Sequence, residues 1–362
     1  MSGSGELYLR YCSLNIADQA GNGVELAGLQ GTNQVLRIRF STHYYTTMSP
    51  ASMNARVYNL SQTTIQNILA LASKNPPTDV GVPNATSALV TLKAGYISNT
   101  GDQTIFRGMI YQLRQGKENA TDSYLDIFAA DGDAAHVFGY VSQSVPAGSS
   151  AVDQWNILGQ SWSPWQISTG EPPNGLSTTG RSRGRVLFGP TRERLRELSD
   201  YNNFTFNILN GQLQGAPVGA PLSTNQTAIE VNSQTGMIGI PEQTESGVTV
   251  TTLLNPQIRW GTVLKINNSE IAQLLVQNGL NGSATSTGVT PFNQAPAFVP
   301  QLNSDGLYVV IHVHHTGDTR NNPWYSIMTC LSIDPSAQVP LAKPEYQYPS
   351  GAGGSVLGSG AT

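Results

Sequence analysis

Residues 124–133 (YLDIFAADGD) place a strand pattern directly before a turn pattern. Tyr124, Leu125, Ile127 and Phe128 are residue types that favour strands. The cluster Asp131-Gly132-Asp133 is typical of a tight turn, because Gly and Asp accept the backbone angles that a turn requires. A short strand that ends in a tight turn predicts a β-rich fold. We interpret Asp131, Gly132 and Asp133 as a structural loop that also starts a helix.

The composition agrees with this prediction. A chain of 362 residues exceeds one ordinary core, so two or three domains are expected. Charged residues make up 12%, about half the usual share, while Gly (37) and Pro (21) are frequent. A surface so poor in charge indicates burial against other subunits. The alternative is a plain polar β-protein. The net charge of −4 argues against a general nucleic-acid binder.

Two cysteines, Cys12 and Cys330, stand far apart in strand-like sequence. We expect buried free thiols in a reducing compartment and no disulfide framework. The first residues lack the basic and apolar pattern of a secretion signal. No run of 18 apolar residues occurs, so no membrane segment is expected.

Hydrophobic alternation predicts most of the strands, and the helices follow from apolar stripes and caps. Ser61 is expected to cap a helix with Ile65 and Ile68 on its apolar face, and Thr191 to cap a second helix carrying Leu195. A third helix is expected over residues 152–162. The expected strands are residues 7–16, 35–40, 55–58, 88–96, 104–114, 123–130, 204–209, 229–231, 248–254, 257–267, 307–314 and 324–333.

Two segments form a weak internal repeat. Residues 104–130 and 307–333 both read as a strand, a Gly-containing loop and a second strand. Gly116 and Tyr124 are separated by eight positions, as are Gly317 and Tyr325. Two copies of one β-unit would let a trimer present six similar units to a six-fold ring.

Catalytic and metal motifs are weak. His312, His314 and His315, with Asp318, invite a metal site, but strand histidines in an interface explain the same pattern. Asp126, Asp131 and Asp133 invite a carboxylate pair, which a turn explains more simply. The sequence has no nucleophile elbow, no HExxH motif and no phosphate-binding loop. We therefore expect no catalytic, cofactor-binding or metal-binding residue, no cofactor and no enzymatic activity.

An arginine cluster lies in residues 181–196: Arg181, Arg183, Arg185, Arg192, Arg194 and Arg196. Its members could bind nucleic acid, form solvated ion pairs with Glu193 and Glu197, or contact another subunit. We take these six arginines as the candidate interface.

Several runs resemble baseplate hub proteins of contractile-tailed bacteriophages, whose fold is related to the tail-tube and type VI secretion spike superfamily. They are residues 55–61, 106–108, 124–133, 232–239, 254–256 and 315–325. In the last run, Asn321 stands where similar hubs commonly have Gly; Asn tolerates the left-handed conformation, so the loop could persist. Gly317, Asp318, Thr319 and Arg320 are accordingly interpreted as a structural loop.

The resemblance implies a mainly β fold with a smaller α/β portion. It predicts two tail-tube-like β-barrel domains, residues 1–135 and 229–345, the second with an insertion near 268–303. An α/β middle domain would span residues 136–228, and residues 346–362 would form a flexible tail.

The same resemblance implies a structural virion protein of the tail baseplate, made in the host cytoplasm. As a homotrimeric hub it would join the six-fold tail tube to the three-fold spike and frame the DNA channel. Its partners would be itself, the tail tube or tube-initiator protein, the spike and other baseplate proteins, without sequence-specific nucleic-acid binding. The alternatives are a carbohydrate-binding or depolymerising tail component and a tail-tube subunit.

Overall fold

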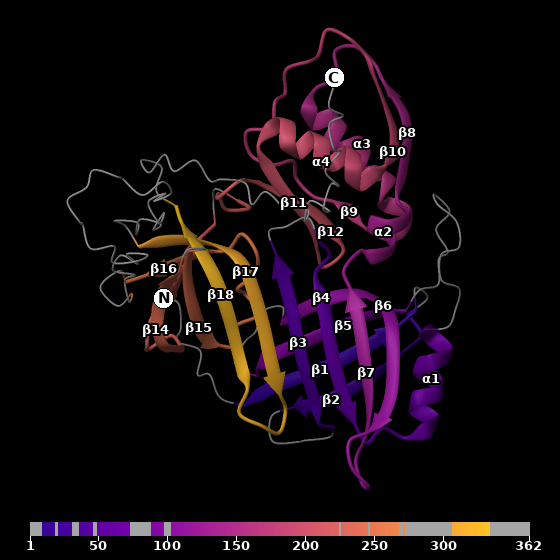
Figure 1. The fold of residues 1–362 in the computed structure, drawn as a ribbon, viewed down its shortest axis with the longest axis vertical. Helices are drawn as coiled ribbons and strands as arrows, with labels where there is room; N and C mark the ends of the chain where they lie inside the picture. The colour runs from indigo at the N-terminus through magenta and orange to yellow at the C-terminus, as the bar shows by residue number, and fades with distance from the viewer. Residues whose placement is uncertain are drawn as a thin grey trace, which may run out of the picture.

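The computed structural model of the chain describes residues 9–18, 21–30, 36–45, 49–72, 88–97, 103–223, 226–244, 247–267, 271 and 306–333. One large sheet dominates the fold, and the helices other than α1 gather in the middle of the chain (Figure 1). No helix in the described part of the chain is long and apolar enough to cross a membrane.

The large sheet has 13 strands, and most of them follow the hydrogen-bonded order β14–β15–β18–β17–β3–β4–β7–β6–β5–β1–β2. Strand β16 adds to β17, and β13 pairs with β16 in parallel. The strands are β1 (Arg10–Ala17), β2 (Gly23–Gln30), β3 (Ile38–Tyr45), β4 (Ser52–Tyr58), β5 (Leu89–Tyr96), β6 (Thr104–Lys117), β7 (Ser123–Ala130), β13 (Ile229–Val231), β14 (Met237–Thr244), β15 (Gly247–Leu253), β16 (Val263–Ile266), β17 (Leu307–Asp318) and β18 (Trp324–Ser332).

Alternating side chains give this sheet one buried face and one open face. In β4, Met53, Ala55 and Val57 are buried, whereas Asn54 between them is exposed. Successive residues of a strand point to opposite faces, so this pattern places apolar side chains in a common core. Each fully buried Leu, Ile or Phe contributes about 1.5–3 kcal/mol to stability.

Helix α1 (Gln62–Ala72) confirms the cap predicted at Ser61. The Ser61 side chain accepts a hydrogen bond from the backbone N–H of Thr64 at 3.1 Å, which satisfies one free donor of the first turn. Ile65 and Ile68 are its buried residues.

Residues 104–130 and 307–333 each form an antiparallel hairpin, β6–β7 and β17–β18, but the prediction that Gly116 and Gly317 lie in loops is wrong, because both lie within strands. Their registers differ by one residue. Gly116 lies opposite Tyr124, whereas Gly317 lies opposite Trp324 and Tyr325 faces Thr316. Equal sequence spacing therefore does not give equal pairing.

The middle of the chain packs around a second core that contains Trp155, Trp162 and Trp165. Helices α3 and α4 lie between a two-stranded ribbon and a small three-stranded sheet (Figure 1). The elements are α2 (Asp133–Phe138), β8 (Tyr140–Val145), α3 (Ala151–Ser161), the 3₁₀ turn η1 (Ser163–Trp165), β9 (Ser168–Thr169), β10 (Arg185–Pro190), α4 (Thr191–Asn202), β11 (Phe204–Leu209) and β12 (Gln212–Pro217).

The prediction of a mainly β protein with a smaller α/β portion is confirmed, and strands 123–130, 204–209 and 229–231 match the structure. The described strands on either side of the middle region belong to one sheet, which is continuous through β17 and β3. The limits of the proposed domains stay a prediction. The insertion near 268–303 lies almost entirely, and the tail at 346–362 entirely, outside the described residues.

Two details of the sequence analysis are wrong. Thr191 is the first residue of α4 rather than its cap, and its hydroxyl bonds to that of Ser161 at 2.7 Å. The strand expected at 257–267 is shorter, because turns occupy the residues before β16. Strands β2, β8, β9, β10, β12 and β14 were not expected. Both cysteines are buried free thiols, as predicted.

Candidate functional site

Strands β3 and β17 form a seam that joins the first and last parts of the described chain. They pair antiparallel, with His43 opposite His314 and Phe40 opposite Gly317. Through this pairing the two hairpins of the repeat belong to one sheet. The candidate loop 317–320 lies at the end of the seam, but Gly317 and Asp318 are the last two residues of β17 and not loop residues as predicted, because they pair with Phe40 and Arg39 of β3. Thr319 and Arg320 follow the strand.

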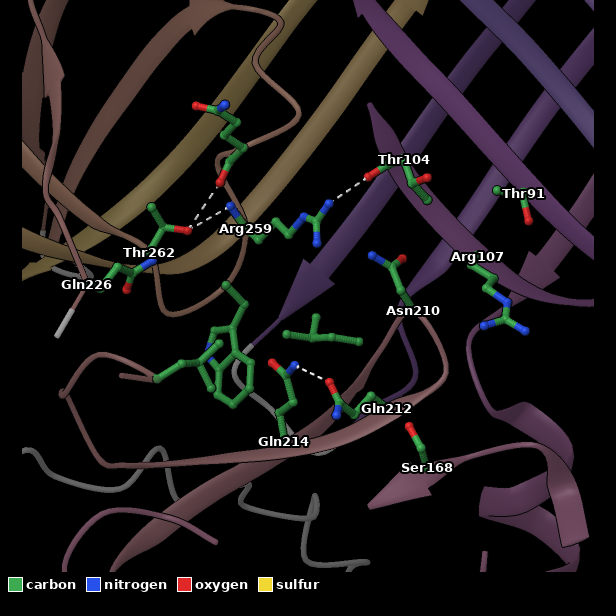
Figure 2. A pocket seen from close by; sticks show the side chains of 14 residues that line it. Thr91, Thr104, Arg107, Ser168, Asn210, Gln212, Gln214, Gln226, Arg259 and Thr262 are labelled. Carbon is green, nitrogen blue, oxygen red and sulfur yellow. Dashed lines mark hydrogen bonds between the residues drawn. The ribbon is translucent and has the colours of Figure 1, made fainter. Parts of the chain in front are cut away.

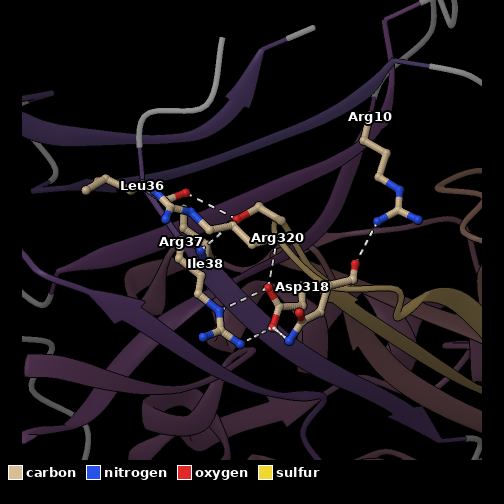
Figure 3. Close-up of polar contacts among 8 residues, drawn as sticks. Arg10, Leu36, Arg37, Ile38, Asp318 and Arg320 are labelled. Carbon is tan, nitrogen blue, oxygen red and sulfur yellow. Dashed lines mark hydrogen bonds and ion pairs between the residues drawn. The ribbon is translucent and has the colours of Figure 1, made fainter. Parts of the chain in front are cut away.

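Asp318 anchors this loop (Figure 3). Arg37 donates from Nε to Oδ1 at 3.3 Å and from Nη2 to Oδ2 at 2.9 Å. The backbone N–H of Arg320 also donates to Oδ1, at 2.9 Å. Burial raises the pKa of Asp318, but the donation from Arg37 and the backbone outweighs it, so the pKa lies below its usual value.

Thr319 and Gly317 complete the seam. The Thr319 hydroxyl accepts from the Ile38 N–H at 3.0 Å and donates to the Leu36 carbonyl at 3.2 Å. A Cβ on Gly317 would overlap the ring of Phe40, so a side chain does not fit there. Arg10 of β1 donates to the Asn321 carbonyl at 2.9 Å.

The expected role of Asn321 is not realised, because Asn321 is not among the residues with positive φ. Asp318, through its bond to the Asn321 side chain at 3.2 Å, orders this turn instead. Gly317, Asp318 and Thr319 thus act in packing and hydrogen bonding, while Arg320 is exposed.

The second candidate loop joins the sheet to the middle of the chain. Both carboxylate oxygens of Asp131 accept from the Gly211 N–H, at 3.1 and 3.3 Å. Burial raises the pKa of Asp131 to about 7. Gly132 has φ 67° and precedes α2, whose first residue is Asp133. Asp131 and Asp133 therefore have different roles. Asp131 accepts hydrogen bonds from Gly211, whereas Asp133 lies in the first turn of α2, where a carboxylate is favourable.

Asp126, the third carboxylate of the catalytic hypothesis, has a different role, because it forms an ion pair with Arg56. Its oxygens accept from Arg56 at 2.6 and 3.0 Å, and the Arg56 guanidinium lies 3.9 Å from the Tyr124 ring centre. The Arg37 guanidinium lies over the Tyr58 ring in the same way, 4.7 Å from the ring centre. The sequence analysis missed both pairs, since strand pairing alone brings these arginines to their partners.

The histidines of β17 separate onto two faces. His314 stacks on His43 with ring centres 4.1 Å apart, and His312 stacks on Tyr45 at 4.5 Å. Ser41 Oγ lies 3.2 Å from His43 Nε2 and 2.9 Å from His314 Nε2. His315 points to the core, where its Nδ1 bonds to Ser326 at 2.8 Å. The four groups of the metal hypothesis therefore do not converge.

This histidine ladder belongs to an open face of the sheet that carries mainly uncharged polar side chains. The alternating exposed or half-buried positions of the central strands define it. Its members on β15, β18, β17, β3 and β4 are Thr249, Thr251, Tyr325, Ile327, Thr329, His312, His314, Thr316, Arg39, Ser41, His43, Tyr45, Ser52 and Asn54.

The arginine cluster lies elsewhere, on β10, on α4 and just before β10. Arg185 and Arg194 both pair with Glu197, at 3.0 and 2.7 Å, and Arg192 pairs with Glu193 at 3.3 Å. The ion-pair interpretation therefore accounts for these three arginines. Arg181, Arg183 and Arg196 form no ion pair with a described residue, and Arg183 and Arg196 are exposed.

Comparison with known proteins adds a family match. Residues 181–278 match the family model of Baseplate hub gp41. This segment begins at the first arginine of the cluster and extends beyond β16. A search of the curated proteins gave no match.

Similar folds occur in two solved tail proteins. A tail protein from Neisseria meningitidis MC58 has a TM-score of 0.52 and 10% identity, covering 89% of this chain and 96% of that one. The 43 kDa tail protein of prophage MuSo2 from Shewanella oneidensis has a TM-score of 0.50 and 7% identity, with coverage of 89% and 98%. These similarities show the fold. The resemblance to phage baseplate hub proteins is confirmed, and the family match supports a structural protein of the phage tail baseplate.

Proposed function

We propose that this protein is a hub of a contractile phage-tail baseplate. Three copies surround a channel, bind the six-fold tail tube or its initiator at one end and hold the three-fold spike at the other. The protein then resides in the virion after synthesis in the host cytoplasm. Its role is geometric and not catalytic.

The observation that carries this proposal is the seam between β3 and β17. It joins two similar hairpins, β6–β7 and β17–β18, in one sheet within one chain. Three chains with two such units each offer six similar units, which matches a six-fold ring. A chain with one unit would need six copies for the same match.

The open face suits the lining of a DNA channel. Lysine and arginine bind phosphates with a strong salt-dependent attraction, so fixed cations would slow a passing duplex. On this face Thr, Ser, Asn, Tyr and neutral His predominate, and Arg39 is the one cation among its members named above. The charge of Arg56, the next residue of this alternation on β4, is paired with Asp126. We therefore assign this face to the channel.

The arginine cluster fits a contact with another subunit or tail protein. It lies on β10 and α4, outside the large sheet. Val186 and Phe188 on β10 are 66% and 63% exposed, so large apolar side chains accompany the unpaired arginines. Exposed apolar groups together with arginine are typical of protein interfaces.

Light scattering and native mass spectrometry of the purified chain, alone and with its tail-tube and spike proteins, test the proposal. The expected result is a trimer that binds both partners. A six-chain ring would favour a tail-tube subunit. A chain that stays monomeric at high concentration, in a baseplate without three-fold density, would contradict the proposal.

The carbohydrate alternative needs a separate measurement. Binding on a glycan array or release of reducing sugar would favour a carbohydrate-binding or depolymerising component. A hub should give neither, and it should not clear peptidoglycan or polysaccharide in a zymogram.

A further inference from the structure

A polar pocket lies where three parts of the chain meet (Figure 2). Thr104 and Arg107 come from β6, Gln212 and Gln214 from β12, and Arg259 from the turn before β16. The cavity volume is about 890 Å³. Small-molecule sites span roughly 300–1,000 Å³, so the pocket holds more than a single small ion.

The pocket is cationic. Among the described residues that line it are two arginines and no aspartate or glutamate. Arg259 is held in place, because its Nη2 donates to the Thr104 carbonyl at 3.1 Å and its Nε to the Pro256 carbonyl at 3.3 Å.

The positive charge of Arg107 is only weakly balanced by a neighbouring carboxylate. Its guanidinium forms no hydrogen bond or ion pair with a described residue. Asp131 interacts with it electrostatically, but Asp131 is buried outside the pocket lining and both its oxygens accept from Gly211. Because burial raises the pKa of Asp131 to about 7, this carboxyl carries only part of a charge at neutral pH.

The rest of the lining offers amide hydrogen-bonding groups. Gln214 Nε2 donates to Gln212 Oε1 at 2.9 Å, which leaves Gln214 Oε1 as an acceptor and Gln212 Nε2 as a donor. Asn210 accepts from Tyr44 at 3.2 Å and keeps its side-chain N–H groups. Peptide groups need this mixture of donors and acceptors.

The two arginines are also placed apart. In Figure 2 their guanidinium groups lie on opposite sides of Asn210, and they come from elements far apart in the sequence. A chain with several carboxylates could engage both groups at once. Guanidinium–carboxylate bonds are among the stronger hydrogen bonds in proteins.

We propose that this pocket binds an acidic peptide segment of another protein, with carboxylates at Arg107 and Arg259 and peptide groups at the glutamine side chains. The proposal rests on the proposed function only in taking that protein to be a neighbouring tail component. It gives the middle of the chain a recognition site apart from the arginine cluster.

Isothermal titration of the full chain with an acetylated, amidated hexaglutamate peptide tests this site. We expect binding that weakens at least tenfold in Arg107→Gln, which also removes the electrostatic interaction of Arg107 with Asp131. The matched control is Arg114→Gln, an exposed arginine of the same strand outside the pocket, which should bind like the wild type. Arg259→Gln should weaken binding too, with circular dichroism to check folding.

Titrations with other ligands test whether the pocket is specific for an acidic peptide. Hexaglutamine, inorganic phosphate and a short DNA duplex should bind at least tenfold more weakly than hexaglutamate. Equal binding of hexaglutamine would overturn the proposal, as would Arg107-dependent binding of phosphate or DNA in place of the peptide. An equal loss in Arg114→Gln would also overturn it.

The oligomeric state measured in the same samples keeps the two proposals apart. Trimers that fail to bind hexaglutamate would overturn the pocket proposal and leave the hub proposal standing. Arg107-dependent peptide binding by a chain that never forms trimers would support the pocket and contradict the hub.

Discussion

Arg37 and Asp318 stand 281 positions apart in the sequence, and the guanidinium of Arg37 donates two hydrogen bonds to the carboxylate of Asp318. The pair closes the seam between β3 and β17. The Asp318 side chain is 4% exposed and that of Arg37 31%. A buried carboxylate that loses its partner destabilises the fold, and the partial exposure of Arg37 reduces the effect.

We therefore expect Arg37→Met to lower the free energy of unfolding by about 2 kcal/mol, as measured by urea denaturation. The matched control is Arg39→Met, because Arg39 lies nearby on β3 and is exposed. The control should lose less than about 0.5 kcal/mol. Similar losses in both variants would show that the pair has no special role.

The histidine ladder should make the seam sensitive to acid. Burial lowers the pKa of His43 and His312, and burial together with the neighbouring histidines lowers that of His314 to about 4. A lowered folded-state pKa gives stability that is present above about pH 6.5 and lost as the pH falls toward 4. Stacked imidazoles that gain charge also repel each other.

The double variant His43→Gln/His314→Gln should therefore lose less stability than the wild type between pH 6.5 and 4. The difference should be on the order of 1 kcal/mol, because half-exposed groups are screened by solvent. Thermal unfolding at several pH values measures it. Buried His315 remains in both proteins and provides the shared background. Parallel pH profiles would contradict the prediction.

Asp131 should make the stability of the fold depend on pH in the opposite direction from the histidines. Burial raises its pKa from 3.8 to about 7, so its contribution to stability is present in full below pH 3.8 and lost as the pH rises through 7. In Asp131→Asn the side chain stays neutral and can still accept from Gly211. This variant should gain stability relative to the wild type as the pH rises from 4 to 8.

Asp131→Ala separates charge from hydrogen bonding. It leaves the Gly211 N–H without its acceptor, which costs about 1–3 kcal/mol at every pH. Unfolding of the two variants by denaturant at pH 4 and pH 8 gives the comparison. If Asn and Ala behave alike at both pH values, the bond between Asp131 and Gly211 does not stabilise the fold.

Strands with strong alternation could be predicted from the sequence, and residues 123–130 are an example. Strand β2 could not, because Gly23 and Gly28 weaken its pattern. Strand β8 contains Ser-Gln-Ser at its centre and is exposed there. Local propensity does not detect strands that form because a partner strand is present.

The candidate loops were found for a local reason, since turns require Gly and Asp. Their partners were not, because Asp318 meets Arg37 and Asp131 meets Gly211 through tertiary packing. For the same reason, three arginines of the cluster turned out to be ion-paired within the chain. The pocket with Arg107 and Arg259 had no sequence signal, as three distant segments build it.

Gly132 should not tolerate a side chain. Its φ is 67°, and a Cβ there would overlap Ile208. Left-handed backbone costs a non-glycine residue about 1–2 kcal/mol before any overlap. Gly148 offers a matched control, because its φ is 91° and a Cβ added there would meet no atom within 4 Å.

We expect Gly132→Ala to lose at least about 1 kcal/mol more stability than Gly148→Ala in urea denaturation. The excess measures the overlap with Ile208. Equal losses would mean that backbone strain alone sets the cost and that the loop can move away from Ile208.

The arginine cluster should divide into two groups with different effects. Arg183 and Arg196 are exposed and have no ion-pair partner among the described residues, so Arg183→Ser/Arg196→Ser should change the stability of the isolated chain by less than about 0.5 kcal/mol. If these arginines contact a neighbouring protein, the same variant should reduce assembly, because charge-paired interface arginines often carry binding energy.

Arg185→Ser is the comparison, since it breaks the pair with Glu197 inside the chain. Native mass spectrometry of trimers and of mixtures with tail proteins measures assembly, and denaturation measures stability. Normal assembly of Arg183→Ser/Arg196→Ser with every partner would remove the cluster from the interface and leave it as solvated surface charge.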